Sequence, residues 1–173
     1  MGSEMCIRDR IIGQGRDNEE APALIYNANY GNLSCQVIVE TYYDASTTSS
    51  SVGGIFGSIL SHLPSVTVDK CINAGNIDSY CSLGTDGSVS VVAGGIGGGV
   101  IGTYESQKQT KIINCYNLCN SITSMYDRPN LSNEGAAARI GGEGANNFSI
   151  NTTILNGSLP TNYIGPDEKN GGS

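Results

Sequence analysis

A short phrase recurs along this chain, and its spacing constrains the fold more than any other feature. Residues 68–77 read VDKCINAGNI, and residues 112–122 repeat the pattern as IINCYNLCNSI, 44 positions later. Each copy begins with an apolar residue, continues with a small or polar residue and then Asn, and ends on another apolar residue. A copy at 24–33 precedes these two at the same offset, and a weaker copy is predicted at 150–159, 38 residues after the third.

A glycine-rich phrase alternates with the first one. It reads VGGIFG at 52–57 and AGGIGGG at 93–99, with degenerate forms IIGQG at 11–15 and RIGGEG at 139–144. Self-similarity at a fixed period of roughly 20 to 50 residues is typical of solenoids, because each unit buries its apolar stripe only against its neighbours. The predicted units are approximately 11–51, 52–92, 93–138 and 139–173.

The local pattern inside the units is that of strands. SVSVVA at 88–93 alternates polar and apolar residues, and the apolar residues of the chain lean towards Ile and Val, which favour strands. No long window carries a convincing helical stripe. We therefore predict an all-β fold, a parallel β-helix-like solenoid of about four repeats with inserted loops. The main inserts are TYYDASTTSSS at 41–51 and SMYDRPNLSNEGAAA at 124–138.

Charge and hydropathy exclude several classes of partner. The net charge is −7 and only 14% of residues are charged, against about 25% in average domains. No basic cluster is present that could release counterions from nucleic acid or bind an anionic membrane surface. No stretch approaches the roughly 18 apolar residues that cross a bilayer, so no membrane-spanning segment is predicted.

The first ten residues are predicted to be a non-native leader. Residues 5–10 read MCIRDR, which resembles the translated read-through of a transposon adapter used in sequencing libraries. The β-solenoid fragment then covers 11–173, and we expect an export signal and an anchor to lie outside this chain. Five cysteines remain, at Cys35, Cys71, Cys81, Cys115 and Cys119.

The pairing of VGGI with VDKCINAGNI, and of AGGI with INCYNLCNSI, resembles the GLUG-motif repeats of bacterial surface proteins. The resemblance covers roughly residues 50–160 and more faintly 11–49. It implies a right-handed β-helix-like stack in a secreted or surface-displayed protein. Two features depart from the motif: Cys119 stands where the motif has Gly, and the inserts separate the copies.

Asn29, Asn73 and Asn117 occupy equivalent positions of three copies. Equivalent positions of a parallel stack lie about 4.8 Å apart, so these side chains are predicted to form a structural ladder of amides, as in other stacked β structures. Ligand binding by the amide row is the functional alternative. An Asn at a strand corner also tolerates the left-handed backbone conformation.

Cys71 and Cys115 fall on neighbouring rungs of the same predicted ladder. Their expected separation permits a disulfide if the protein is exported, whereas free Cys packs as a small hydrophobe; we favour free thiols. Cys115 and Cys119 lack the further ligands of a zinc site. No metal or cofactor site is predicted.

No catalytic constellation is evident. His62 is the only histidine, and it stands in SHLP outside both phrases. A carbohydrate-active β-helix enzyme would need carboxylates and cations converging on one face, whereas Asp69, Asp78 and Asp86 are scattered and not repeated. The chain is therefore predicted not to be an enzyme, with a carbohydrate-active enzyme fragment as the alternative.

We predict a structural stalk or adhesin-like binding surface of a bacterial secreted or cell-surface protein. Its partners would be host-surface or polysaccharide ligands. Aromatic residues in or beside the inserts are the candidate contacts, and a passive spacer without a ligand is the third alternative. The candidate contact residues are Tyr42, Tyr43, Tyr104 and Tyr126.

Overall fold

The protein forms strands throughout the part of the chain that its computed structural model describes. The described residues are 23–39, 47–57, 59–60, 66–84, 88–98, 100–101, 111–129, 131–141 and 144–158. They contain no helix and hence no helix that could span a membrane. Nearly all strand pairs are parallel. The predicted all-β class with parallel strands is thus confirmed.

Four sheets are built from strands that recur in the same order along the chain. Sheet 1 contains β1 (Ala23–Ile25), β6 (Thr67–Asp69), β11 (Lys111–Ile113) and β16 (Gly144–Ala145). Sheet 2 contains β2 (Ala28–Asn29), β7 (Ile72–Asn73), β12 (Tyr116–Asn117) and β17 (Phe148–Ser149). Sheet 3 contains β3 (Leu33–Val39), β8 (Ile77–Leu83) and β13 (Ser121–Arg128), with β14 (Leu131–Glu134) and β18 (Ile154–Leu155) paired to β13. Sheet 4 contains β4 (Thr47–Gly53), β9 (Ser88–Gly94) and β15 (Ala136–Ala138).

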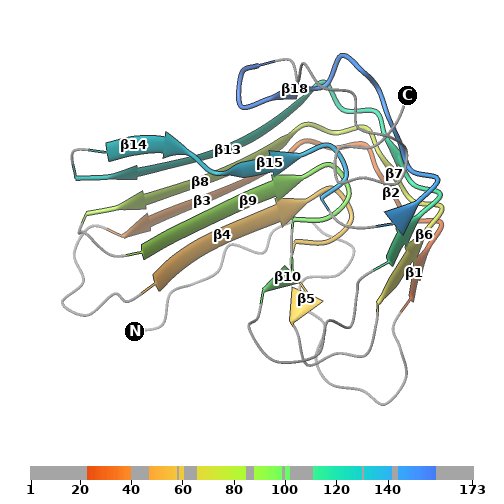
Figure 1. The fold of residues 1–173 in the computed structure, drawn as a ribbon, viewed down its shortest axis with the longest axis horizontal. Coiled ribbons are helices and arrows are strands. Elements are labelled where there is room, and N and C mark those ends of the chain that lie inside the picture. Colours follow the sequence, from red (N-terminus) through yellow and green to blue (C-terminus); the bar gives the residue numbers. More distant parts are fainter. Residues whose placement is uncertain are drawn as a thin grey trace.

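We call each run of successive strands a tier. A tier contributes one strand to each sheet in which it takes part. Tier 1 is β1–β4, tier 2 is β6–β9, tier 3 is β11–β13 with β15, and tier 4 is β16–β18. A small parallel pair, β5 (Ile59–Leu60) with β10 (Val100–Ile101), lies beside the sheets. Figure 1 shows sheets 3 and 4 as two layers of long strands and sheets 1 and 2 as short strands at the other end.

The register between tiers follows the repeat. Val68 pairs with Leu24 on one side and with Ile112 on the other, each 44 residues away. Ile77 pairs in the same way with Leu33. Like residues therefore lie over like residues in the first three tiers.

The predicted fourth copy at 150–159 is wrong in register. Ile112 pairs with Gly144, and Asn117 pairs with Ser149, 32 residues later. Tier 4 is shorter than the others. In it Gly144 stands in place of the leading apolar residue of the phrase, and Ser149 stands in place of its Asn. The sequence template therefore matched a later segment by chance.

The chain turns at the same corner in every tier. The residue that follows each strand of sheet 1 has a left-handed backbone, with φ between 54° and 58°. A single left-handed residue redirects the chain sharply, although non-glycine residues adopt it at a cost. These corner residues are Tyr26, Lys70, Asn114 and Asn146.

Two apolar clusters fill the interior. One lies beneath sheet 1 and includes the isoleucines of the glycine-rich phrases, Ile55, Ile96 and Ile140, all fully buried. The other lies between sheets 3 and 4 and includes Ile77 and Ile122. Stacked β-branched side chains of this kind suit the pleated surfaces of sheets.

The glycine-rich phrase and the Asn phrase meet inside the molecule. A Cβ on Gly54 would lie 2.6 Å from Asn73 Oδ1, and a Cβ on Gly95 would lie 2.6 Å from Asn117 Nδ2. Real Cβ atoms do not approach other atoms so closely, so the second glycine of each phrase leaves room for the buried amide of the next tier, and also for the backbone carbonyl oxygen of Gly95 or Arg139 beside it. This contact gives a physical reason for the alternation of the two phrases.

The predicted inserts consist partly of strands. Residues 47–51 of the first insert belong to β4. The second insert, at 124–138, contains the end of β13, the antiparallel strand β14 and then β15. Strand β14 therefore folds back onto β13 in the same sheet. The many Ser and Ala residues of these strands hide the alternation of polar and apolar residues that would mark them as strands in the sequence.

We expect Gly95→Ala to destabilise the protein by about 3 kcal/mol, since overpacking typically costs about 1–3 kcal/mol and the new methyl group would overlap the Asn117 amide. Urea unfolding measures the change. Gly31→Ala is the matched control, because the nearest atom to its Cβ, Asn29 Oδ1, would be 3.8 Å away. Equal effects of the two substitutions would contradict the proposed fit.

Candidate functional site

The asparagines of the repeat form a continuous row of hydrogen bonds through the interior. Asn29 Nδ2 donates to Asn73 Oδ1 at 2.8 Å, and Asn73 Nδ2 donates to Asn117 Oδ1 at 3.0 Å. The row ends where Asn117 Nδ2 donates to Ser149 Oγ at 3.2 Å. Asn73, Asn117 and Ser149 are fully buried, so this row has a structural role. We call it the buried amide row.

The left-handed corner interpretation of these asparagines is wrong. Asn29, Asn73 and Asn117 lie in the strands of sheet 2, and the left-handed conformation belongs to the corner residues described above. The amides of Asn29 and Asn73 also bind their own tiers, since Asn29 Nδ2 donates to Gly31 O at 2.8 Å and Asn73 Nδ2 donates to Gly75 O at 2.9 Å. Both kinds of hydrogen bond hold the amide in one orientation.

Cys71 and Cys115 lie on neighbouring tiers, and both are free thiols. The backbone N–H of Cys71 donates to Cys115 Sγ at 3.4 Å, and the Cys115 thiol donates to Ile113 O at 3.2 Å. Hydrogen bonding with Cys71, together with burial, raises the pKa of Cys115, so this thiol is neutral at neutral pH. Cys35, Cys71, Cys81, Cys115 and Cys119 are all buried, and none of these five cysteines forms a disulfide.

The acidic residues considered for catalysis do not converge in the described part of the chain. Asp69 ends β6 in sheet 1 and pairs with its neighbour Lys70 at 3.5 Å, whereas Asp78 is exposed on β8 in sheet 3. Asp86 and His62 lie outside the described residues. Among the residues that the structure describes, no group of His, Cys, Asp and Glu side chains could hold a metal ion.

Of the four tyrosines predicted as loop contacts, the structure describes one. Tyr42, Tyr43 and Tyr104 lie outside the described residues. Tyr126 lies on strand β13, is half-buried, and packs against the cluster between sheets 3 and 4. It is therefore part of a strand rather than a loop.

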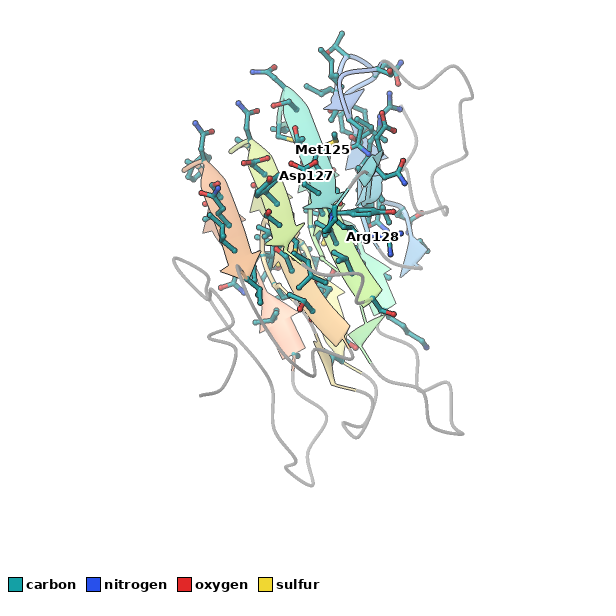
Figure 2. The ribbon with its side chains drawn as sticks, turned by 90° about the vertical axis from the view of Figure 1, so that its left-hand side faces the viewer. Met125, Asp127 and Arg128 are labelled. Atoms are coloured by element: carbon teal, nitrogen blue, oxygen red, sulfur yellow. The ribbon has the colours of Figure 1, made fainter. Side chains whose placement is uncertain are left out.

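Contacts around the end of β13 explain how this region is held. Figure 2 shows Met125, Asp127 and Arg128 along the end of this strand. Tyr80 Oη donates to Asp127 Oδ2 at 2.6 Å, and this hydrogen bond raises the pKa of Tyr80. The Arg128 guanidinium lies 5.7 Å from the centre of the Tyr126 ring, within cation–π range. The hydrogen bond between Tyr80 and Asp127 joins β8 to β13, whereas the contact between Arg128 and Tyr126 lies within β13.

The outward side of sheet 2 carries three exposed large apolar side chains, those of Tyr30, Tyr116 and Leu118. Residues that alternate with the buried amide row point outward, because side chains alternate across a strand. They form two columns along the stack, which we call the sheet 2 face. One column is Ala28, Ile72, Tyr116 and Phe148, and the other is Tyr30, Ala74, Leu118 and Ile150.

A second column of asparagines borders this face. Asn32 Oδ1 accepts a hydrogen bond from the backbone N–H of Asn76 at 2.9 Å, and Asn76 Oδ1 accepts one from the N–H of Asn120 at 3.0 Å. Unlike the buried amide row, this column lies at the surface, with Asn32 and Asn120 exposed. We call it the surface amide row.

The sequence-based search missed both features. The surface amide row recurs at the same 44-residue interval as the buried one, so the repeat contained the signal. The residues of the sheet 2 face share only their apolar character and not their identity, and a search for recurring letters passes over them. Together the two features make an apolar surface with an amide border.

Asn73→Ala should destabilise the protein by about 3 kcal/mol, because it removes the central member of the buried amide row and leaves buried partners unsatisfied at about 1–3 kcal/mol each. Asn32→Ala removes one acceptor at the exposed end of the surface amide row, so its effect should stay near 1 kcal/mol. Chemical denaturation of both variants gives the comparison. A loss for Asn73→Ala no larger than that for Asn32→Ala would show that burial of the row contributes little.

Comparisons of the chain with protein-family models, with curated proteins and with solved structures find no significant match.

Proposed function

We propose that the protein is a non-catalytic segment of a parallel β-solenoid, with the tiers as its successive coils, and that it forms part of a bacterial secreted or cell-surface protein. The observation that carries this proposal is the contact between identical side chains of successive tiers, Asn29, Asn73 and Asn117. In a solenoid each coil contacts mainly its neighbours, and such contacts between like residues are what that arrangement requires.

A stack of tiers of this kind is suited to a stalk. Each tier adds about 4.8 Å to the stack, and its stability comes from the interfaces with the adjacent tiers. The length can therefore grow without a change in the cross-section. The similarity of the repeat to GLUG motifs supports a place on the outside of a bacterium.

The sheet 2 face supports an adhesin-like role over that of a passive spacer. Tyr30 is 74% exposed and Tyr116 is 49% exposed, and contiguous exposed apolar residues commonly mark interaction sites. The net charge of −7 favours solubility of a protein that displays such a face.

The solenoid architecture is tested by duplicating one repeat. Inserting a second copy of residues 68–111 after Lys111 adds one 44-residue period in register with the pairing of Val68 and Ile112. We expect a folded protein of unchanged or greater thermal stability, longer by about 4.8 Å in small-angle X-ray scattering. A matched insertion of residues 68–89, which ends inside β9 and so lacks a complete sheet 4 strand and the glycine-rich phrase, should unfold or aggregate. If both insertions unfold the protein, the tiers are not independent coils.

The surface location is tested by proteolysis of intact cells. In the bacterium that carries the gene, protease added outside the cells should release peptides of this chain, or the chain should appear in the medium. A cytoplasmic enzyme measured in parallel controls for lysis. Peptides detected only after the cells are broken would refute an external location.

A further inference from the structure

The sheet 2 face is continuous, uncharged and accessible. Its two columns contain aliphatic and aromatic residues without a single charged one. Tyr30 is 74% exposed, Tyr116 49% and Leu118 40%. In an acidic chain, such a neutral face requires a partner whose recognition does not depend on charge.

Two of the three aromatic residues of this face, Tyr116 and Phe148, lie over one another on successive tiers, and the third, Tyr30, stands in the other column on tier 1. Tyr116 and Phe148 of successive tiers have ring centres 5.9 Å apart and planes inclined by 45°. Aligned tiers lie about 4.8 Å apart, so the apolar side chains offer a contact surface that repeats at short intervals along one direction. A partner that fits these apolar columns would be extended along the stack and itself repetitive.

The border of the face supplies hydrogen-bond donors. In the surface amide row, the Oδ1 atoms of Asn32 and Asn76 are occupied by backbone N–H groups of the next tier. The side chains of Asn32 and Asn120 are exposed and that of Asn76 is half-buried, so the amide Nδ2 groups of Asn32 and Asn120 are the donors at the surface. On the opposite border the cation of Lys70 is engaged by Asp69 at 3.5 Å and lies 5.2 Å from the Tyr26 ring centre.

We propose that the sheet 2 face binds a neutral polysaccharide that runs along the stack, which would give the adhesin-like function proposed above its ligand. The C–H faces of sugar rings pack on aromatic and aliphatic side chains, while their hydroxyl groups accept hydrogen bonds from amide N–H groups and donate to the Tyr hydroxyls. A polyanionic chain is disfavoured by the net charge of −7.

A second copy of the protein satisfies this face less well. Two such faces in contact would offer the Nδ2 groups of the surface amide row few acceptors, because the two columns are apolar apart from the Tyr30 and Tyr116 hydroxyls. Buried donors without acceptors destabilise a complex. Sugar hydroxyls act as both donors and acceptors, so they leave no such group unpaired.

The experiment is affinity gel electrophoresis of the full chain through gels that contain cellulose derivatives, xyloglucan, galactomannan or, as a polyanion, alginate. At least one neutral polymer should retard the protein, and alginate should not. Tyr116→Ala and Tyr30→Ala should each weaken retardation about tenfold, the effect expected when a central aromatic contact is truncated. Asn120→Asp, which replaces an amide donor by an acceptor of the same size, should weaken it severalfold.

Ile38→Ala is the matched control, because Ile38 is 58% exposed and apolar but lies on sheet 3; it should bind as the wild type does. Circular dichroism verifies that each variant is folded. The proposal is overturned if no neutral polymer retards the folded protein, if Ile38→Ala weakens binding as much as Tyr116→Ala, or if sedimentation shows self-association that Tyr116→Ala abolishes. None of these results would alter the outcome of the repeat duplication or of the surface proteolysis, so the stalk proposal is judged separately.

Discussion

The hydrogen bond from one asparagine amide to the next is the interaction on which the rest of the structure depends. A primary amide both donates and accepts, so one residue type can bind its own copy above and below without a break. The bonds of 2.8 and 3.0 Å between Asn29, Asn73 and Asn117 fix the register of the tiers. A slip by one residue would turn these amides outward and place apolar outward-facing side chains in the interior, so the buried row selects a single alignment.

The requirement for space around that row explains the glycines. The amides of Asn73 and Asn117 occupy positions that a Cβ on Gly54 or Gly95 would fill. At the end of tier 3, Arg139 follows Ala138, the partner of Gly94, and so stands where the first two tiers have glycine, while in tier 4 the shorter Ser149 replaces the asparagine. The two phrases thus change together within one chain, as expected for residues in contact.

The repeat alone predicted much of the fold, because it reports directly which residues lie on neighbouring tiers. The all-β class, the parallel pairing and the proximity of Cys71 to Cys115 all follow from that single periodicity. The predicted alignment of tier 4 was wrong because Gly144 and Ser149 follow the same backbone path as Ile112 and Asn117 but are different residue types. The left-handed corner was missed for a similar reason: Tyr26 and Lys70 have no common chemistry, and only their φ angles reveal the shared role.

The candidate binding surface was predicted least well. Sequence reasoning turned to tyrosines in the inserts, since loops commonly carry binding residues, whereas the structure places an apolar face on a sheet. Its residues differ in type, from Ala28 to Tyr116 in one column, so a search for recurring residue types does not find them. Reading the positions that alternate with a known buried residue is a more reliable guide in stacked sheets, because alternation follows from strand geometry.

The hydrogen bonds of the buried amide row all run the same way, each Nδ2 donating towards the higher-numbered tier until the Ser149 hydroxyl receives the last one. Hydrogen bonds arranged head to tail polarise one another, and the dipoles of these amides add rather than cancel. The buried amide row consequently has an electrical direction as well as a chain direction, with its donor groups facing one way along the stack and its acceptor oxygens the other.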